Sequence, residues 1–249
     1  MQVGILQCDN VRSSLSEAHG EYPAMIEKGF SGLDDGSPFT FRVYPVFEGV
    51  LPDQVDECEA YVITGSRYSV LDTEELWIHQ LQNFIVRLNK ATIKTIGICF
   101  GHQIMAVAMG GKVARADCGW QIGVHRSRVL QSKGFMQPPA EHFDLAMLCE
   151  DQVDKIPDTA TVLAATPQCE YAMLMYGEHF LGTQGHPEFS PHFAKALLNI
   201  RQEEFPSKRF DKGMASFSER PPDGELLFMW FSHFLLQGRE EAPADVVND

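Results

Sequence analysis

The segment GICFGHQ, residues 97–103, places a cysteine between two glycines where the pattern predicts a strand turning into a helix. Glycines at these positions allow the tight turn of a nucleophile elbow, because side chains there would clash with a neighbouring strand or helix. The dipole of the following helix would stabilise a thiolate at Cys99. The backbone N–H of Phe100 would point at an oxyanion formed on an attacked carbonyl. Alternatively, Cys99 is a packing residue and the glycines only ease a close crossover.

A second segment, GTQGHPEF (residues 182–189), places an imidazole and a carboxylate two residues apart at the end of a predicted strand. In extended backbone, residues i and i+2 face the same side, so His186 and Glu188 can meet, and Pro187 stiffens the turn between them. A carboxylate beside an imidazole fixes its tautomer and supports its protonated form, as a base that activates a thiol requires. Together with the elbow, this pair predicts a Cys99–His186–Glu188 site.

A third segment, Thr64-Gly65-Ser66, ends an earlier predicted strand. Because ligands bind at the carboxyl ends of the strands in open α/β sheets, its loop should open on the same edge as Cys99. A glycine there lets the backbone N–H of Gly65 approach the reacting carbonyl as a second oxyanion donor. The alternative is an ordinary turn between a strand and a helix.

A metal site is a further interpretation of the segment HPEFSPH, which offers His186, Glu188 and His192 as ligands. The segment lacks the H-E-x-x-H spacing that places two histidines on one face of a helix. We therefore expect no metal and no cofactor.

The elements that must position these residues alternate between strands and helices along much of the chain. Strands are predicted at residues 2–7, 39–46, 60–66, 94–98 and 179–185. Helices are predicted at residues 16–28, 72–88, 101–109, 191–202 and 224–237, the second of them capped by Asp72 or Thr73. Such alternation implies right-handed crossovers and a largely parallel sheet with both faces covered.

The middle of the chain changes character. Residues 112–129 and 143–162 carry short strand-like runs without long helices between them, which predicts an antiparallel extension of the sheet. Residues 205–222 are interpreted as a polar surface loop. The prediction is one α/β domain with a central, mostly parallel sheet flanked by helices.

Composition and charge narrow the classes of partner and compartment. The formal net charge of −14 argues against a nucleic-acid or anionic-membrane partner, because phosphate binding needs a basic face. No apolar stretch is long enough to span a bilayer, and the first ten residues lack the apolar run of a secretion signal. Six cysteines without a C-x-x-C pair then favour reduced thiols in the cytoplasm.

GICFGHQ, HPEF and ITGS together resemble the class I (triad) glutamine amidotransferase family, in which a G-x-C-x-G-x-Q elbow precedes an H-P-E segment. The resemblance covers residues 2–193 and extends to GWQIGVHRSRV (residues 119–129) and EDQVDKIP (residues 150–157). It implies a flavodoxin-like fold of this family over residues 1–240, with a short tail at residues 241–249. The chain looks most like free-standing members rather than glutaminase domains fused to synthases.

The resemblance also implies a mechanism on a small-molecule substrate, glutamine or a γ-glutamyl compound. Cys99 would attack the γ-amide carbonyl to form a thioester, His186 would carry the proton to the leaving amine, and Glu188 would orient His186. Backbone N–H groups of Gly65 and Phe100 would hold the oxyanion, and water would release glutamate. The implied substrate contacts are Gln103 and Ser66.

Departures from the family pattern keep other functions open. Thr64 stands where many members have the first of two glycines, and Leu148-Cys149-Glu150-Asp151 replaces a Ser-His or Thr-His pair. Because the chain has no room for a synthase domain, a separate synthase subunit would receive ammonia, or the protein would be a stand-alone γ-glutamyl peptidase. A non-catalytic binding or regulatory subunit is the remaining alternative. Cys149 itself is interpreted as a core thiol.

Overall fold

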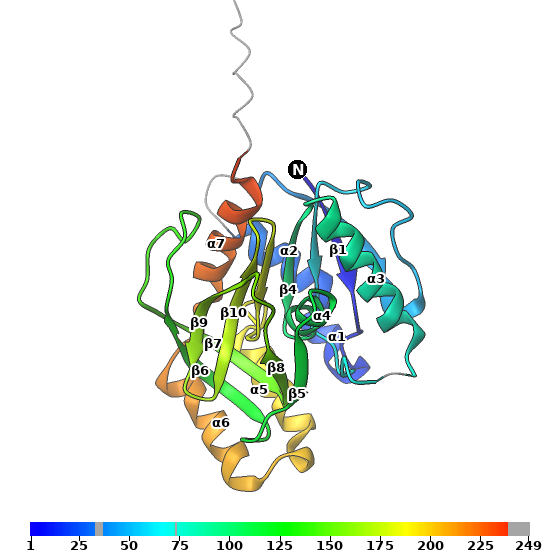
Figure 1. Cartoon of the computed structure of the whole chain (residues 1–249). Helices are drawn as coiled ribbons and strands as arrows, with labels where there is room; N and C mark the ends of the chain where they lie inside the picture. The colour runs from blue at the N-terminus through cyan, green and yellow to red at the C-terminus, as the bar shows by residue number, and fades with distance from the viewer. Residues whose placement is uncertain (33–36, 73, 239–249) are drawn as a thin grey trace, which may run out of the picture.

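A nine-stranded sheet forms the centre of this computed structural model, within the residues that it describes, 1–32, 37–72 and 74–238 (Figure 1). Its strands are β1 (Gln2–Gln7), β2 (Thr40–Pro45), β3 (Ala60–Ile63), β4 (Lys94–Ile98), β6 (Gln121–Val129), β7 (His142–Cys149), β9 (Ala160–Thr166), β10 (Cys169–Tyr176) and β11 (Phe180–Thr183). They are arranged in the order β2-β1-β3-β4-β11-β10-β9-β6-β7. A smaller antiparallel sheet pairs β5 (Lys112–Arg115) with β8 (Asp151–Lys155).

The large sheet has a parallel half and an antiparallel half. Neighbouring strands run parallel from β2 through β1, β3 and β4 to β11. From β11 through β10, β9 and β6 to β7, neighbouring strands run antiparallel. The predicted parallel sheet with an antiparallel extension is therefore confirmed.

Helices cover both faces of the parallel half (Figure 1). The helices are α1 (Ser13–His19), α2 (Tyr22–Ser31), α3 (Leu76–Lys90), α4 (Phe100–Ala108), α5 (Pro191–Ile200), α6 (Ser207–Glu219) and α7 (Gly224–Leu236), with short 3₁₀ turns at Val46–Glu48 and Gln202–Glu204. Helices α2 and α7 share a core with Ala60 and Val62 of β3, whereas α3 and α4 share another with Tyr61 and Ile63. Because successive strand residues point to opposite faces, the two helix pairs lie on opposite sides of the sheet.

Two predicted helices differ from the structure by more than a residue or two at an end. The helix predicted at residues 16–28 is two helices, α1 and α2, separated at Gly20, whose φ of 77° ends the first. The helix predicted from residue 72 begins at Leu76. The carboxylate of Asp72, one of its two predicted caps, accepts a hydrogen bond from the Ser69 amide (2.8 Å) in the preceding turn. The other predicted cap, Thr73, lies outside the described residues.

The prediction of a polar loop at residues 205–222 is wrong, because most of this segment forms helix α6. Phe210, Gly213 and Phe217 are buried on one face of α6, and Met214 packs beside them. These positions have the i, i+3, i+4, i+7 spacing of an amphipathic helix. The helix crosses β6 closely, since a Cβ built on Gly123 would lie 2.6 Å from the Cα of Gly213.

The carboxyl ends of β1, β3, β4 and β11 meet at one edge of the sheet, and the segments that follow these strands carry the predicted site residues. The predicted domain boundary at residue 240 and the tail at residues 241–249 lie outside the described residues. No helix in the described part of the chain is both long and apolar enough to cross a membrane.

Candidate active site

Cys99 lies on a strained turn between β4 and α4. Its backbone has φ 51° and ψ −101°, a conformation that residues other than glycine rarely adopt and that costs on the order of 1–3 kcal/mol. The Cys99 amide donates a hydrogen bond to the Thr183 carbonyl of β11 (2.8 Å), which holds the turn against the sheet. The residue is only 6% exposed, and it borders a cavity at the carboxyl edge of the sheet, where an elbow nucleophile meets its substrate.

The glycines around Cys99 allow the close packing of the elbow. A Cβ built on Gly97 would lie 2.6 Å from the carbonyl carbon and oxygen of Gly101. A Cβ built on Gly101 would lie 2.4 Å from the carbonyl oxygen of Ile63 in β3. Both distances are too short for a real contact, so the prediction that side chains here would clash with a strand or helix is confirmed.

His186 and Glu188 meet as the i, i+2 spacing predicts. The His186 Nδ1 and the Glu188 Oε1 are 2.8 Å apart, and the residues are only 5% and 8% exposed. The imidazole stacks on the Phe189 ring at a centroid distance of 4.0 Å, and the His186 amide donates to the Ala146 carbonyl of β7 (2.8 Å). Backbone, ring stacking and carboxylate therefore all fix the orientation of the imidazole.

The electrostatic surroundings of His186 favour its protonated form. Burial by itself would lower the pKa of His186, but the negative charges of Glu188 and of a Cys99 thiolate, together with the hydrogen bond to Glu188, outweigh burial and raise the pKa to about 10. An imidazolium beside a thiolate is the charge arrangement of an activated cysteine nucleophile.

Gly65 brings the third predicted segment into contact with this pair. A Cβ built on Gly65 would lie 2.8 Å from Cε1 of His186 and 3.7 Å from Cβ of Cys99. The structure thus brings together Cys99, His186, Glu188 and Gly65 from separate parts of the sequence. Phe100 is the first residue of α4, so its amide has no acceptor one turn earlier within the helix.

The family model for glutamine amidotransferase class-I matches residues 59–200, which include all of these residues. The chain belongs to the class I glutamine amidotransferase family. It is 28% identical over 240 residues to γ-glutamyl peptidase 5 of Arabidopsis thaliana, covering 91% of this chain and 92% of that protein. It is 30% identical over 207 residues to γ-glutamyl peptidase 3 of the same plant, covering 78% and 81%.

Solved structures share the fold of this family member. A glutamine amidotransferase from Thermotoga maritima superposes with a TM-score of 0.72 at 18% identity, covering 94% of this chain and 98% of that one. A longer relative matches only in part. GMP synthase [glutamine-hydrolyzing] of Neisseria gonorrhoeae is 30% identical over 155 residues, which are 58% of this chain and 28% of that protein.

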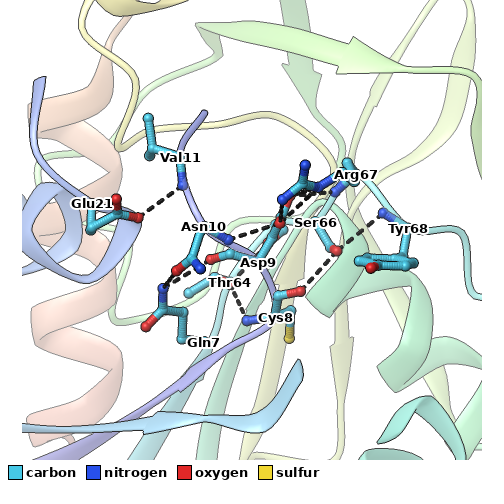
Figure 2. Close-up of polar contacts among 11 residues, drawn as sticks. Gln7, Cys8, Asp9, Asn10, Val11, Glu21, Thr64, Ser66, Arg67 and Tyr68 are labelled. Carbon is cyan, nitrogen blue, oxygen red and sulfur yellow. Dashed lines mark hydrogen bonds and ion pairs between the residues drawn. The ribbon is translucent and has the colours of Figure 1, made fainter. Parts of the chain in front are cut away.

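Two loops of this amidotransferase fold brace each other beside the candidate site (Figure 2). The Cys8 amide donates to the Thr64 hydroxyl (2.9 Å), and the Ser66 hydroxyl donates to the Cys8 carbonyl (2.9 Å). The Asp9 carboxylate accepts from Nη2 (2.5 Å) and from the backbone amide (3.0 Å) of Arg67. The loop that carries Gly65 is therefore fixed by the backbone of Cys8 and the carboxylate of Asp9 in the loop after β1.

Ser66, a predicted substrate contact, has its hydroxyl engaged within the protein. Besides donating to Cys8, this hydroxyl accepts from the Tyr68 amide (3.1 Å). Ser66 also lines both small cavities at the site. A direct contact between Ser66 and substrate stays a prediction.

Gln184 is a candidate functional residue that sequence reasoning missed. Its Nε2 donates to the Cys99 Sγ (3.4 Å), and its Oε1 accepts from Nε2 of Gln103 (3.1 Å). Gln103, the other predicted substrate contact, also donates to the Asp151 carbonyl (2.7 Å). No pattern in the sequence singles out Gln184, because its role depends on the Cys99 sulfur lying opposite it in space.

Two cavities open at the candidate site. One, of about 290 Å³, is bordered by Cys99, and a smaller one, of about 50 Å³, by His186. Both are lined by Ser66, Arg67, Leu148 and Arg201. The larger cavity lies near the lower end of the size range of ligand pockets and fits a compact, amino-acid-sized ligand.

The segment that departs from the family pattern lines the larger cavity. Burial raises the pKa of the Cys149 thiol well above its usual value, which keeps it protonated and agrees with a core thiol. Arg115 pairs with Glu150 (3.0 Å) and Asp151 (3.4 Å), and the Ser69 hydroxyl donates to Asp151 (2.5 Å). In the described part of the chain, no three His, Cys, Asp or Glu side chains are grouped to hold a metal ion.

Proposed function

We propose that the protein is a cysteine hydrolase that cleaves the γ-amide bond of glutamine or of a γ-glutamyl compound. The observation that carries this proposal is the convergence of Cys99, the His186–Glu188 pair and Gly65 at one edge of the sheet. Membership of the class I glutamine amidotransferase family supports the same chemistry.

In the proposed reaction, the Cys99 thiolate attacks the γ-carbonyl carbon while His186 holds the thiol proton. The developing oxyanion accepts hydrogen bonds from the backbone N–H groups of Gly65 and Phe100, as the position of both residues beside Cys99 favours. The C–N bond then breaks, and His186 gives its proton to the leaving amine. A water molecule, deprotonated by His186, attacks the thioester, releases glutamate and restores the thiol.

Glu188 and Gln184 support this reaction without touching the reacting carbonyl. Glu188 fixes Nδ1 of His186, which leaves Nε2 to exchange protons with Cys99 and the leaving group. Gln184 donates to the sulfur atom, and such a donor favours the thiolate over the neutral thiol.

A stand-alone γ-glutamyl hydrolase is the version that the comparisons favour. The γ-glutamyl peptidase 5 relative matches over nine-tenths of both chains, so the match leaves little of that relative unaccounted for. Six unpaired cysteines agree with a reducing compartment, and the cytoplasm is the location that we propose.

A glutaminase subunit that supplies ammonia to a separate synthase is the second candidate. Its support is the match to GMP synthase [glutamine-hydrolyzing], which covers 28% of that relative. A non-catalytic subunit is the outcome if no substrate is turned over.

Glutamate release from glutamine and from γ-glutamyl dipeptides by the purified protein tests the proposal. The Cys99→Ala variant should lose at least about 10⁴-fold in turnover, as expected when a covalent nucleophile is removed. Cys118→Ala is the matched control, since this half-buried thiol lies outside the site. Dipeptide turnover that depends on Cys99 supports the stand-alone hydrolase, whereas weak activity on glutamine only supports a synthase subunit. Equal activity of Cys99→Ala and wild type would contradict both.

A further inference from the structure

A large basic groove lies beside the candidate site, between helix α6 and strands β6 and β9. It has a volume of about 1110 Å³, and among the described residues that line it Glu219 is the only one with a carboxylate. Its lining includes six arginine and lysine side chains, Arg126, Arg128, Lys208, Arg209, Lys212 and Arg220. This concentration of positive charge contrasts with the net charge of −14 of the whole chain.

Most of this charge is not neutralised by the protein. Arg126 is paired with Asp144 (2.7 Å), and Arg209 donates to the Trp120 carbonyl. The other four cations have no carboxylate within ion-pair distance among the residues that the structure describes. Unpaired cations lining a concave surface produce a local field that attracts an anionic ligand.

Three of these cations act on the same side chain, His125. His125 lines the groove, where burial lowers its pKa and the charges of Lys212, Arg209 and Arg220 lower it further. The imidazole therefore stays neutral and adds a polar group, and the three neighbouring cations act on the same volume.

The groove adjoins the cavity of the candidate nucleophile at Trp120, which lines both. The guanidinium of Arg201 lies over the Trp120 ring at 5.0 Å and borders the cavity that contains Cys99. Glu204 holds this guanidinium through Nη2 (2.6 Å) and Nε (3.0 Å), which fixes the cation beside the cavity. Cationic groups thus continue from the Cys99 cavity past Trp120 into the groove.

The cavity at Cys99 and the basic groove differ in size and would bind different parts of a substrate. The cavity at Cys99 accommodates an amino-acid-sized group, so a larger leaving group must extend out of it. Resting on the proposed function, we infer that the groove binds the leaving peptide of acidic γ-glutamyl peptides, in which two or more carboxylates follow the γ-glutamyl bond. A long nucleic acid fits less well, because the acidic remainder of the molecule repels an extended polyanion.

Binding of the leaving peptide tests the groove independently of catalysis. Isothermal titration calorimetry of the full-length Cys99→Ala protein compares the tripeptide Ala-Glu-Glu with amidated Ala-Gln-Gln. We expect the acidic peptide to bind more tightly, and Lys208→Gln/Lys212→Gln to weaken its binding by roughly 2- to 30-fold, as for the loss of two exposed ion pairs. The matched control Lys28→Gln/Lys90→Gln removes the same charge from α2 and α3 and should bind like the parent.

Kinetics of the active protein test the substrate class. The ratio of kcat/KM for γ-Glu-Ala-Glu-Glu to that for amidated γ-Glu-Ala-Gln-Gln should exceed one and fall in the Lys208→Gln/Lys212→Gln variant, while turnover of glutamine stays unchanged. Equal binding of both peptides, loss of affinity in the control variant, or tighter binding of a single-stranded oligonucleotide than of Ala-Glu-Glu would overturn the inference. Absence of turnover on every substrate, with selective Ala-Glu-Glu binding intact, would instead refute the proposed function and leave the groove as an acidic-peptide site.

Discussion

Replacing Glu188 by glutamine tests how the candidate base is held. Burial opposes a charged His186, yet the pKa rises from its usual 6.5 to about 10, mainly through the charge of Glu188. This rise corresponds to ~5 kcal/mol in favour of the imidazolium. Glutamine keeps the shape of the side chain but removes the charge and can present an N–H group to Nδ1. We expect turnover to fall on the order of 10³- to 10⁴-fold, as in triads whose carboxylate becomes an amide.

The assay is glutamate release, accompanied by the rate at which iodoacetamide alkylates Cys99 across the pH range. With Glu188 present, the imidazolium persists throughout the neutral range, so the thiol should react quickly at neutral pH. In Glu188→Gln the fast reaction at neutral pH should be lost. Glu178→Gln, an exposed carboxylate in the turn before β11, is the matched control. Unchanged turnover and an unchanged alkylation profile in Glu188→Gln would refute this account of His186.

The same pair makes stability depend on pH. Because the folded-state pKa of His186 is raised above 6.5, its contribution to stability is complete below pH 6.5 and is lost as the pH rises towards about 10. The Tm difference between wild type and Glu188→Gln should therefore shrink over this range in thermal unfolding. A difference that stays constant with pH would contradict the raised pKa.

Three further substitutions have defined outcomes. In Gly65→Ala, the new methyl would lie only 2.8 Å from Cε1 of His186, so the imidazole must move away. We expect kcat to fall roughly 10²-fold with little change in Tm. Full activity would show that the imidazole moves freely. Gln184→Met, which removes the donor to the thiol sulfur, should slow alkylation about 10- to 100-fold, and an unchanged rate would contradict a role for this hydrogen bond. Gly101→Ala should destabilise the fold by about 1–3 kcal/mol in chemical unfolding because its methyl meets a β3 carbonyl, whereas Gly134→Ala, which meets nothing, should not.

The parts of the site that depend on local spacing could be predicted from the sequence. The glycines beside Cys99 and the i, i+2 spacing of His186 and Glu188 act within a few residues of each other, so the pattern alone indicates their geometry. The contact between Gly65 and His186 could be expected because both follow strands that end at the same edge of the sheet.

Features set by distant partners were harder to predict. Helix α6 was missed because lysines, serines and Gly213 separate its apolar positions, and the helix is held by packing against β6 rather than by strong propensity. The helix cap predicted at Asp72 failed because the Ser69 amide, in the preceding turn, takes its carboxylate. Gln184 has no motif of its own, and its role depends on Cys99 lying directly opposite in space.

The basic groove could not be predicted from composition. The chain is strongly acidic as a whole, and the cations of the groove come from β6, helix α6 and the residue that follows that helix. Only the crossing of α6 over β6 at Gly123 and Gly213 brings them together.

Acid-quenched mass spectrometry of the protein during turnover of a γ-glutamyl dipeptide tests whether Cys99 is the nucleophile. We expect a γ-glutamyl adduct on the peptide that contains Cys99, accumulating in wild type and absent from Cys99→Ala. Turnover with no adduct on Cys99, or an adduct on another cysteine, would contradict the proposed nucleophile.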